Sequence, residues 1–370
     1  MTLRIAVDAR PLALPMVGIT RYTFELLQRL LVDSPHEWFL YLDRPSIHPL
    51  PDLPNVHIRA GDCKRNATSS IFAQWFFPRW AKQDRVNIFW SPRHHLPLLL
   101  ASNIKTIVTI HDLVWHFYPE TMSTLGRYLE KALMPSSVRR ADKVISVSEA
   151  TATALVDILG VSNQSLHTIP LASHFIDEVS ETVEGGDETY FLFVGTLEPR
   201  KNLRRLLQAF SHALSEGLSI TTLKIVGGSG WGGVNVKDLA QEHGIEKNIE
   251  VLGRVNNDQL EQLYQQAYAL LMPSLYEGFG LPLLESMGFG VPVISSNASS
   301  MPEVVGAGGL LVDPLSVDEI ANALLLITSD KHLYDDLTKS AKKQAGRYSW
   351  DAAAASTLAI IDGLQSRSIL

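Results

Sequence analysis

Residues 190–215 read YFLFVGTLEPRKNLRRLLQAFSHALS, and this stretch contains the pattern that decides the fold. A short apolar run, 190–194, leads into a polar loop, and apolar residues at helical spacing follow from 203 to 215. That order predicts a strand, a loop and an amphipathic helix in one unit. Similar runs alternate along the whole chain, which predicts α/β architecture with parallel sheets.

The number of such units predicts two doubly wound sheets. The expected strands of the first half are residues 4–8, 39–42, 56–58, 88–90, 105–110 and 143–146, with helices at 21–31 and 123–141. The expected strands of the second half are residues 190–194, 222–226, 249–252, 269–272 and 291–295, with helices at 203–215, 236–243, 257–266 and 282–287.

A polar, acidic stretch at residues 173–188 interrupts this rhythm and is the best linker candidate. A chain of 370 residues is long enough to bury two cores. We therefore expect one Rossmann-like domain at 1–172 and a second at 188–350. A closing helix, 350–365 within a C-terminal segment of about 351–370, is expected to cross back onto the first domain.

Composition indicates a globular protein of a reducing compartment. Hydrophobic residues make up 46% and charged residues 19%, and no stretch approaches the roughly 20 apolar residues that span a bilayer. A lone Cys63 excludes an internal disulfide, and the N-terminus does not resemble a signal peptide. The cytoplasm is the expected location.

The two halves differ in charge. Residues 1–170 contain 18 Lys and Arg against 14 Asp and Glu, whereas residues 171–370 contain 14 against 25. The acidic second half argues against nucleic acid as the main ligand. The mildly basic first half is compatible with a phosphorylated partner, with an anionic membrane surface, or with ordinary variation in surface composition.

The strongest motif is PSLYEGFGLPLLE at residues 273–285, directly after an expected strand. Ligands of open α/β sheets bind beyond the carboxyl ends of the strands. Gly278 and Gly280 allow a tight loop, and a proline suits the first turn of the helix that follows. Glu277 on the loop and Glu285 on the helix are then placed to address two parts of one ligand.

A second candidate is GTLEPRKN at residues 195–202, which follows the first strand of the second half. Arg200 and Lys201 place two cations where a diphosphate would lie, although such pairs are also common on solvated surfaces. Weaker candidates are Gly18, at the start of a helix, and His111 with Asp112, after an apolar strand. An ordinary turn or a structural pair would also account for these.

Two other chemistries are disfavoured. Residues 228–233, GSGWGG, fit a dinucleotide fingerprint literally, but no strand ending in an acidic residue follows at the required distance. A loop lining a nucleotide site is the better interpretation. No Cys/His cluster has metal-ligand spacing, and the adjacent His94 and His95 are expected to point apart. We expect no metal site and no cofactor.

Together these residues resemble the retaining GT-B glycosyltransferases of family 4, which include many bacterial polysaccharide mannosyltransferases. The resemblance covers nearly the whole chain. It rests on DARP (8–11) with Gly18 and Arg21, HD (111–112), SVSE (146–149), GTLEPRKN (195–202), the 277–285 motif, SSMPE (299–303) and GGLLVDP (308–314). One departure is Thr20, where relatives often have glycine.

The resemblance implies two Rossmann-like domains that face each other across a cleft. It implies a role for Glu277 at the donor sugar, for Glu285 at the ribose, and for Arg200 and Lys201 at the diphosphate. His111 would contact the sugar. The remaining donor-binding positions implied are backbone and loop residues, namely Gly18, Arg254, Val255, Gly278, Phe279, Gly280, Leu281 and Leu283.

The implied reaction is retaining transfer of mannose from GDP-mannose, as substrate, onto a saccharide or polyprenol-linked acceptor in O-antigen-like polysaccharide synthesis. A UDP- or dTDP-sugar donor, a sugar-nucleotide epimerase and an inactive binding subunit are the alternatives. Residues 71–80, IFAQWFFPRW, predict either a packed helix or a patch for peripheral contact with the inner face of the membrane. The first is the favoured interpretation of that segment.

Overall fold

The computed structural model describes residues 2–64, 66–175, 189–230 and 232–365. The chain forms two compact units. The first contains Met1–Leu113, Leu125–Leu171 and Ser349–Leu370, and the second contains Val114–Thr124 and Ala172–Tyr348. Residues 114–124, assigned to the first domain from the sequence, group with the second unit. The expected linker at 173–188 lies mostly outside the described residues.

The first unit is built on a parallel sheet in the order β3-β2-β1-β4-β5-β6-β7. Its strands are β1 (Arg4–Asp8), β2 (Glu37–Leu42), β3 (Val56–Ala60), β4 (Ile88–Ser91), β5 (Lys105–Ile110), β6 (Lys143–Ser146) and β7 (Leu166–Thr168). Its helices are η1 (Arg10–Ala13), α1 (Ile19–Asp33), α2 (Asn66–Gln83), α4 (Thr124–Arg140), α5 (Glu149–Leu159) and α13 (Trp350–Gln365).

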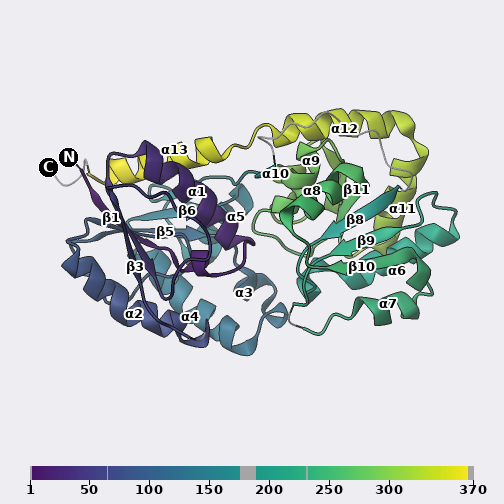
Figure 1. Cartoon of the computed structure of the whole chain (residues 1–370). Helices are drawn as coiled ribbons and strands as arrows, with labels where there is room; N and C mark the ends of the chain where they lie inside the picture. Colours follow the sequence, from purple (N-terminus) through teal and green to yellow (C-terminus); the bar gives the residue numbers. More distant parts are fainter. Residues whose placement is uncertain (1, 65, 176–188, 231, 366–370) are drawn as a thin grey trace. The chain divides into compact units, whose positions relative to one another are not determined.

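The closing helix, α13, packs on α1 within the first unit (Figure 1). Arg29 Nε donates to Asp351 at 2.5 Å, and His36 Nε2 lies 2.7 Å from Asp362 Oδ1. The Tyr22 and Trp350 rings approach with their centroids 6.4 Å apart. Polar pairs and an aromatic contact therefore attach the end of the chain to the unit in which it begins.

The second unit is also built on a parallel sheet, in the order β10-β9-β8-β11-β12-β13. Its strands are β8 (Tyr190–Val194), β9 (Leu223–Val226), β10 (Ile249–Gly253), β11 (Ala267–Met272), β12 (Val293–Ser296) and β13 (Gly309–Val312). Its longer helices are α6 (Leu203–Ser215), α7 (Val236–Glu242), α8 (Asn257–Gln266), α9 (Leu281–Gly288), α11 (Val317–Ser329) and α12 (Lys331–Ala345).

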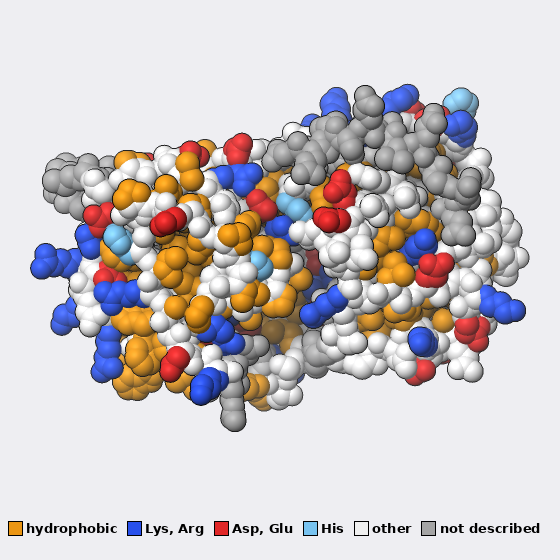
Figure 2. Space-filling view, viewed as in Figure 1, with side chains coloured by type: hydrophobic (Ala, Val, Ile, Leu, Met, Phe, Trp, Pro, Cys, Tyr) orange, Lys and Arg blue, Asp and Glu red, His pale blue; other side chains and the backbone are white. Residues whose placement is uncertain are grey.

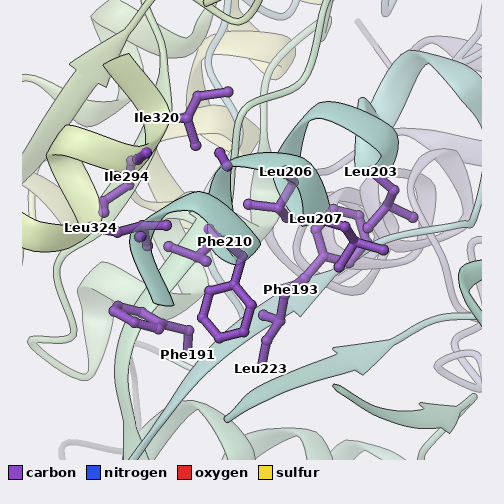
Figure 3. Packing of buried hydrophobic residues seen from close by; sticks show 14 of the residues in the cluster. Phe191, Phe193, Leu203, Leu206, Leu207, Phe210, Leu223, Ile294, Ile320 and Leu324 are labelled. Atoms are coloured by element: carbon purple, nitrogen blue, oxygen red, sulfur yellow. The ribbon is translucent and has the colours of Figure 1, made fainter. Parts of the chain in front are cut away.

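The strand, loop and helix of residues 190–215 fold as expected. Helix α6 buries Leu203, Leu206 and Phe210, spaced three and four residues apart, in the cluster that also contains Phe191 and Phe193 of β8 (Figure 3). Apolar residues at this spacing form one helical stripe, which the sheet covers. The two parallel α/β sheets confirm the predicted fold class.

Some elements were missed because their sequences carry a weak signal. Strand β7 has three residues, all half-buried, and β13 has four, of which only Val312 is fully buried. Such short edge strands show neither a continuous apolar run nor a clear alternation. Helices α11 and α12 were not expected either. None of the described helices combines the length and apolar character needed to cross a membrane.

Each sheet has a point at which the strand order reverses direction. In the first unit it lies between β1 and β4, and in the second between β8 and β11. Crossover connections leave the two strands in opposite directions there, so their loops separate and open a crevice for ligands at the carboxyl edge. The loops after β8 and β11 are those that carry the charged motifs.

Candidate active site

The loops after β8 and β11 are tied to each other by hydrogen bonds. The Leu275 N–H donates to the carbonyl of Arg200 at 2.9 Å, and Asn202 Nδ2 donates to the carbonyl of Pro273 at 2.9 Å. Asn202 is buried and adopts a left-handed φ of 61°, a conformation that asparagine tolerates better than most residues. The basic loop is thereby fixed against the glutamate loop.

Arg200 and Lys201 both pair with Glu277. Arg200 Nη1 lies 2.6 Å from Glu277 Oε2, and Lys201 Nζ lies 2.6 Å from Glu277 Oε1. Arg200 also contacts Glu198 Oε1 through Nη2 at 2.5 Å. Both oxygens of the Glu277 carboxylate are therefore held by a cation, an arrangement that the sequence analysis did not predict.

The pairing keeps Glu277 ionised. Burial on its own would raise the pKa of this carboxyl, but the charges of Arg200 and Lys201 and their hydrogen bonds outweigh burial and lower the pKa to about 2. Cations within about 4 Å of a buried carboxyl favour its charged form and so lower its pKa. At neutral pH the cluster therefore contains a carboxylate and two cations.

The cations are neutralised by acids of the protein, so an incoming diphosphate has to compete for them. Lys201 Nζ has three N–H donors, and the described contacts use one of them, on Glu277. A diphosphate therefore exchanges one anionic partner for another without the cost of bringing a cation out of water. This chemistry suits reversible binding of a phosphate-rich ligand.

The Gly278–Gly280 region turns sharply into α9. Gly280 has φ 111°, and a Cβ there would lie 3.0 Å from Leu283 Cδ1. The Ser300 hydroxyl contacts the carbonyls of Glu277 and Phe279, at 3.0 and 2.8 Å. The Leu283 N–H donates to the Gly280 carbonyl at 3.0 Å and closes the first turn. Half-buried Leu281 begins the helix.

Glu285 is anchored by Tyr264 and lies close to His174, and neither neighbour was predicted from the sequence. The Tyr264 hydroxyl donates to Glu285 Oε2 at 2.8 Å, and His174 Nδ1 lies 3.5 Å from Oε1. Burial, and then the neighbouring Glu285 carboxylate, raise the pKa of Tyr264 well above its ordinary value, so the phenol remains a donor. Because residues 174 and 264 lie far from 285 in the chain, no local pattern indicates the contact.

The glycine-rich segment after β9 is explained by close packing. A Cβ on Gly227 would lie 1.8 Å from the Gly195 carbonyl oxygen, and one on Gly228 would lie 2.3 Å from Arg254 Nε. Arg254, which directly follows β10, therefore packs against this loop, and Val255 is the next residue in the chain. The glycines are needed for these approaches, so their presence does not require a dinucleotide fingerprint.

In the first unit, His111 is buried at the end of β5. Its Nε2 lies 2.9 Å from the Pro92 carbonyl, so this nitrogen carries the proton and donates. Burial, the first cause, and the nearby His94 and Arg93 lower the pKa of His111 to about 3. The ring is therefore neutral, and its Nδ1 is a hydrogen-bond acceptor.

The adjacent His94 and His95 do not point apart as expected, because both reach the same oxygen. His94 Nδ1 and His95 Nε2 lie 3.2 and 3.1 Å from Glu130 Oε2. His94 Nε2 also accepts the His111 backbone N–H at 3.1 Å when that nitrogen is unprotonated. Burial alone would lower the pKa of His94, but the charge and the hydrogen bond of Glu130 outweigh burial and raise it. These histidines and Glu130 therefore link α4 to the loops after β4 and β5.

Gly18, at φ 42°, is the residue that precedes the first turn of α1, and a Cβ there would meet open space.

The structure thus brings part of the expected set together. Arg200, Lys201 and Glu277 form one cluster, and the loop from Gly278 to Gly280 connects that cluster to the helix that carries Glu285. Arg254 and Val255 follow β10, next but one to β8 in the same sheet. Gly18 and His111 belong to the other unit.

Known families match both halves of the chain. The model for "Glycosyltransferase Family 4" matches residues 16–172, and the model for "Glycosyl transferases group 1" matches residues 176–344. The O-antigen chain mannosyltransferase B of Escherichia coli is 31% identical, over 96% of this chain and 98% of its own length. The chain belongs to this glycosyltransferase family. Membership of this family shows that the protein is an enzyme, a glycosyltransferase. It disfavours the alternative function of a sugar-nucleotide epimerase.

Other relatives and solved structures agree with this assignment. The O-antigen chain mannosyltransferase RfbU of Salmonella typhimurium is 28% identical to the glycosyltransferase over 66% of each chain. The sucrose-phosphate synthase of Thermosynechococcus elongatus superposes with a TM-score of 0.77 at 19% identity, covering 99% and 100% of the two chains. WaaG, a glycosyltransferase of lipopolysaccharide biosynthesis, superposes with a TM-score of 0.74 at 16% identity, covering 98% and 100%. At these identities the structures support the GT-B fold alone.

Proposed function

We propose that this glycosyltransferase moves mannose from GDP-mannose onto a saccharide or lipid-linked saccharide, with retention at the anomeric carbon, in O-antigen-like polysaccharide synthesis. The observation that carries the proposal is the pairing of Arg200 and Lys201 with Glu277 at the β8–β11 edge. Mannose is supported by the relatives named mannosyltransferases, including an MMP alpha-(1->4)-mannosyltransferase of Mycolicibacterium hassiacum.

In this proposal the second unit binds the donor. Arg200 and Lys201 hold the diphosphate, Glu277 accepts hydrogen bonds from hydroxyls of the donor sugar, and Glu285 accepts them from the ribose. The anchoring of Glu285 by Tyr264 supports its assignment, because an oriented carboxylate binds a diol with less loss of side-chain freedom. Backbone groups at Arg254 and Val255 meet the base.

Loop and first-unit residues complete the proposed donor contacts. The backbone at Gly18 and along Gly278, Phe279, Gly280 and Leu281 approaches the phosphates and sugar, since glycines permit close contact. Neutral His111 accepts a hydrogen bond from a sugar hydroxyl through Nδ1, which fits its lowered pKa.

The proposed reaction needs neither a metal ion nor a separate protein base. The acceptor oxygen attacks the anomeric carbon on the face from which the diphosphate departs, and the bond from that carbon to the phosphate oxygen breaks. The acceptor proton passes to the departing phosphate oxygen. Arg200 and Lys201 stabilise the charge that develops on the diphosphate, and ionised Glu277 remains beside the short-lived, oxocarbenium-like sugar.

The donor is tested by thermal unfolding with GDP, UDP, ADP and their sugars. A ligand at 100 times its dissociation constant adds about 2.7 kcal/mol of stability, which is readily measured. We expect GDP and GDP-mannose to stabilise most. UDP is the runner-up because HepE of Anabaena, a structure of the same fold, is in complex with UDP and glucose. Stabilisation by UDP but not by GDP would replace the proposed donor.

The reaction itself is tested by following release of the nucleoside diphosphate with and without a saccharide acceptor. Transfer predicts release that depends on the acceptor, and an NMR spectrum of the product gives the anomeric configuration. An inverted product would contradict retention. The proposed location is the cytoplasm, with peripheral attachment to the inner face of the membrane when the acceptor is lipid-linked.

A further inference from the structure

Large apolar side chains are exposed on one part of the first unit. They lie on α2, on the loop after β4 and on α4, and we call this region the α2–α4 face. Trp75 is 58% exposed, and Leu99 and Leu125 are each 69% exposed. The side chains that define the face are Ile71, Trp75, Leu98, Leu99, Leu125 and Tyr128.

Hydrogen bonds hold the three segments of the face together. The Leu98 N–H donates to Gln74 Oε1 of α2 at 2.7 Å, and Arg140 of α4 donates to the Pro97 carbonyl at 3.0 Å. The loop that presents Leu98 and Leu99 is therefore fixed between the two helices. In Figure 2, orange and blue side chains, with a red one among them, lie over the region where Figure 1 places α2 and α4.

The charged residues of the two helices are nearly all cationic. Glu130 is the only acid in either helix, and it contacts His94 and His95 inside the unit. The basic residues are Arg79, Lys82, Arg127, Lys131, Arg139 and Arg140. Two helices with six cations and one inward-facing acid contrast with the net charge of −7 for the whole chain.

We propose that the α2–α4 face binds the surface of an anionic lipid bilayer. Exposed Trp and Tyr suit the boundary between lipid headgroups and acyl chains, aliphatic side chains insert a short distance, and Lys and Arg contact anionic headgroups. The inference rests on the proposed function in one respect, namely that a lipid-linked acceptor gives the enzyme a reason to lie on a membrane.

The mixture of side chains favours a bilayer over a protein partner. The centres of protein interfaces are depleted of charged residues, and lysine in particular is uncommon there. On the α2–α4 face, Lys82 and Lys131 lie on the same helices as the exposed Trp75 and Leu125. Long basic side chains next to shallow apolar ones are typical of helices that lie on membranes.

Sedimentation with lipid vesicles tests the proposal. The probes are phosphatidylcholine vesicles with and without about 30% of the anionic lipid phosphatidylglycerol. We expect the full chain to bind the anionic vesicles, to bind neutral ones at least about tenfold more weakly, and to be released by salt. Equal binding to both vesicles, or binding to neither, would overturn the proposal.

Surface variants identify the face. Trp75→Ser with Leu99→Ser, and separately Lys82→Glu with Lys131→Glu, are each expected to weaken binding to anionic vesicles at least about tenfold. The matched controls are Leu315→Ser, at a side chain 61% exposed in the second unit, and the exposed Lys343→Glu of α12. Both controls will bind as the wild type does. Face variants that also bind normally would contradict the assignment.

Two further measurements distinguish a membrane surface from a dimer interface and from part of the donor site. Light scattering reports whether the face joins two copies instead, in which case the wild type is dimeric, the face variants are monomeric, and the proposal is wrong. Transfer to a water-soluble acceptor will be unchanged in the face variants, because none of these residues belongs to the donor site. If no nucleotide sugar supports transfer but the vesicle results hold, the proposed function fails and the membrane surface remains.

Discussion

The two sheets of this glycosyltransferase reverse strand order in the same way, but the loops at their carboxyl edges present different groups. In the second unit, Arg200 and Lys201 are held by the buried carboxylate of Glu277. In the first unit, the loops after β4 and β5 present histidines, of which His111 is neutral and His94 is bound to Glu130. The loop after β5 therefore offers a neutral hydrogen-bonding group, although a buried ion pair of Arg10 with Asp8 lies at the end of β1.

The difference indicates how the two units divide the proposed work. A cluster of paired ions at the β8–β11 edge can exchange its internal carboxylate for a diphosphate. The neutral imidazole of His111 can form a hydrogen bond with a hydroxyl group without attracting a charged ligand. Variants that change one charge or one hydrogen bond at a time test this division of roles.

The largest expected effect is that of Glu277→Gln. The variant keeps the size of the side chain but removes the buried negative charge between Arg200 and Lys201. We expect turnover to fall by about 10³-fold and the free energy of unfolding to fall by about 3 kcal/mol. Steady-state kinetics and urea unfolding measure the two quantities. Turnover within threefold of the wild type would remove Glu277 from the proposed reaction.

Next in size is Lys201→Ala, which removes a buried cation that we place on the diphosphate. We expect binding of the nucleoside diphosphate to weaken about 100-fold. The control is Arg204→Ala, because Arg204 forms an exposed pair with Glu242 in the same unit. Calorimetric titration checks both variants, and equal affinities for the two would argue against the assignment.

A third prediction concerns pH and the buried, neutral His111. Below its ordinary pKa of 6.5, His111 takes up a proton in the unfolded chain, whereas the folded protein does not bind that proton until about pH 3. The unfolded state then holds more protons, so His111 lowers stability by about 2 kcal/mol between pH 6.5 and pH 5. In His111→Gln this contribution is absent, so the decline seen by urea unfolding will be correspondingly shallower. Parallel curves for variant and wild type would contradict the assigned pKa.

The smallest effect is expected for Tyr264→Phe, which removes the hydroxyl that orients Glu285. We expect the KM for the donor to rise about tenfold while kcat stays within twofold, because the ribose contact lies away from the reacting carbon. Glu285→Ala, which removes the carboxylate itself, will weaken donor binding further. A fall in kcat with unchanged KM in Tyr264→Phe would place this pair in the chemical step instead.

Local pattern was sufficient for much of the fold. The sequence predicts α8 at residues 257–266 and α13 at 350–365 with the bounds that the structure shows, because both carry a clear helical pattern. It also identifies the loops after β8 and β11, because Gly and Pro there mark tight turns before helices. The short edge strands β7 and β13 lack such a signal.

The contacts within the site were less predictable, because they join residues far apart in the chain. Glu277 pairs with cations 76 and 77 positions earlier, and Glu285 is held by Tyr264, 21 positions earlier. His94 and His95 converge on Glu130 because their loop bends, which adjacency in the sequence does not reveal. Residue types indicated the chemistry, but only the fold gave the partners.

The central claim is that the diphosphate takes over the cations that Glu277 holds. Its most direct test is the affinity for GDP, or for whichever nucleoside diphosphate the donor screen selects, in Glu277→Gln and Lys201→Ala. We predict opposite signs, with tighter binding in the first variant, whose cations lack their internal partner, and weaker binding in the second. Weaker binding in both variants, or no change in Lys201→Ala, would contradict the claim.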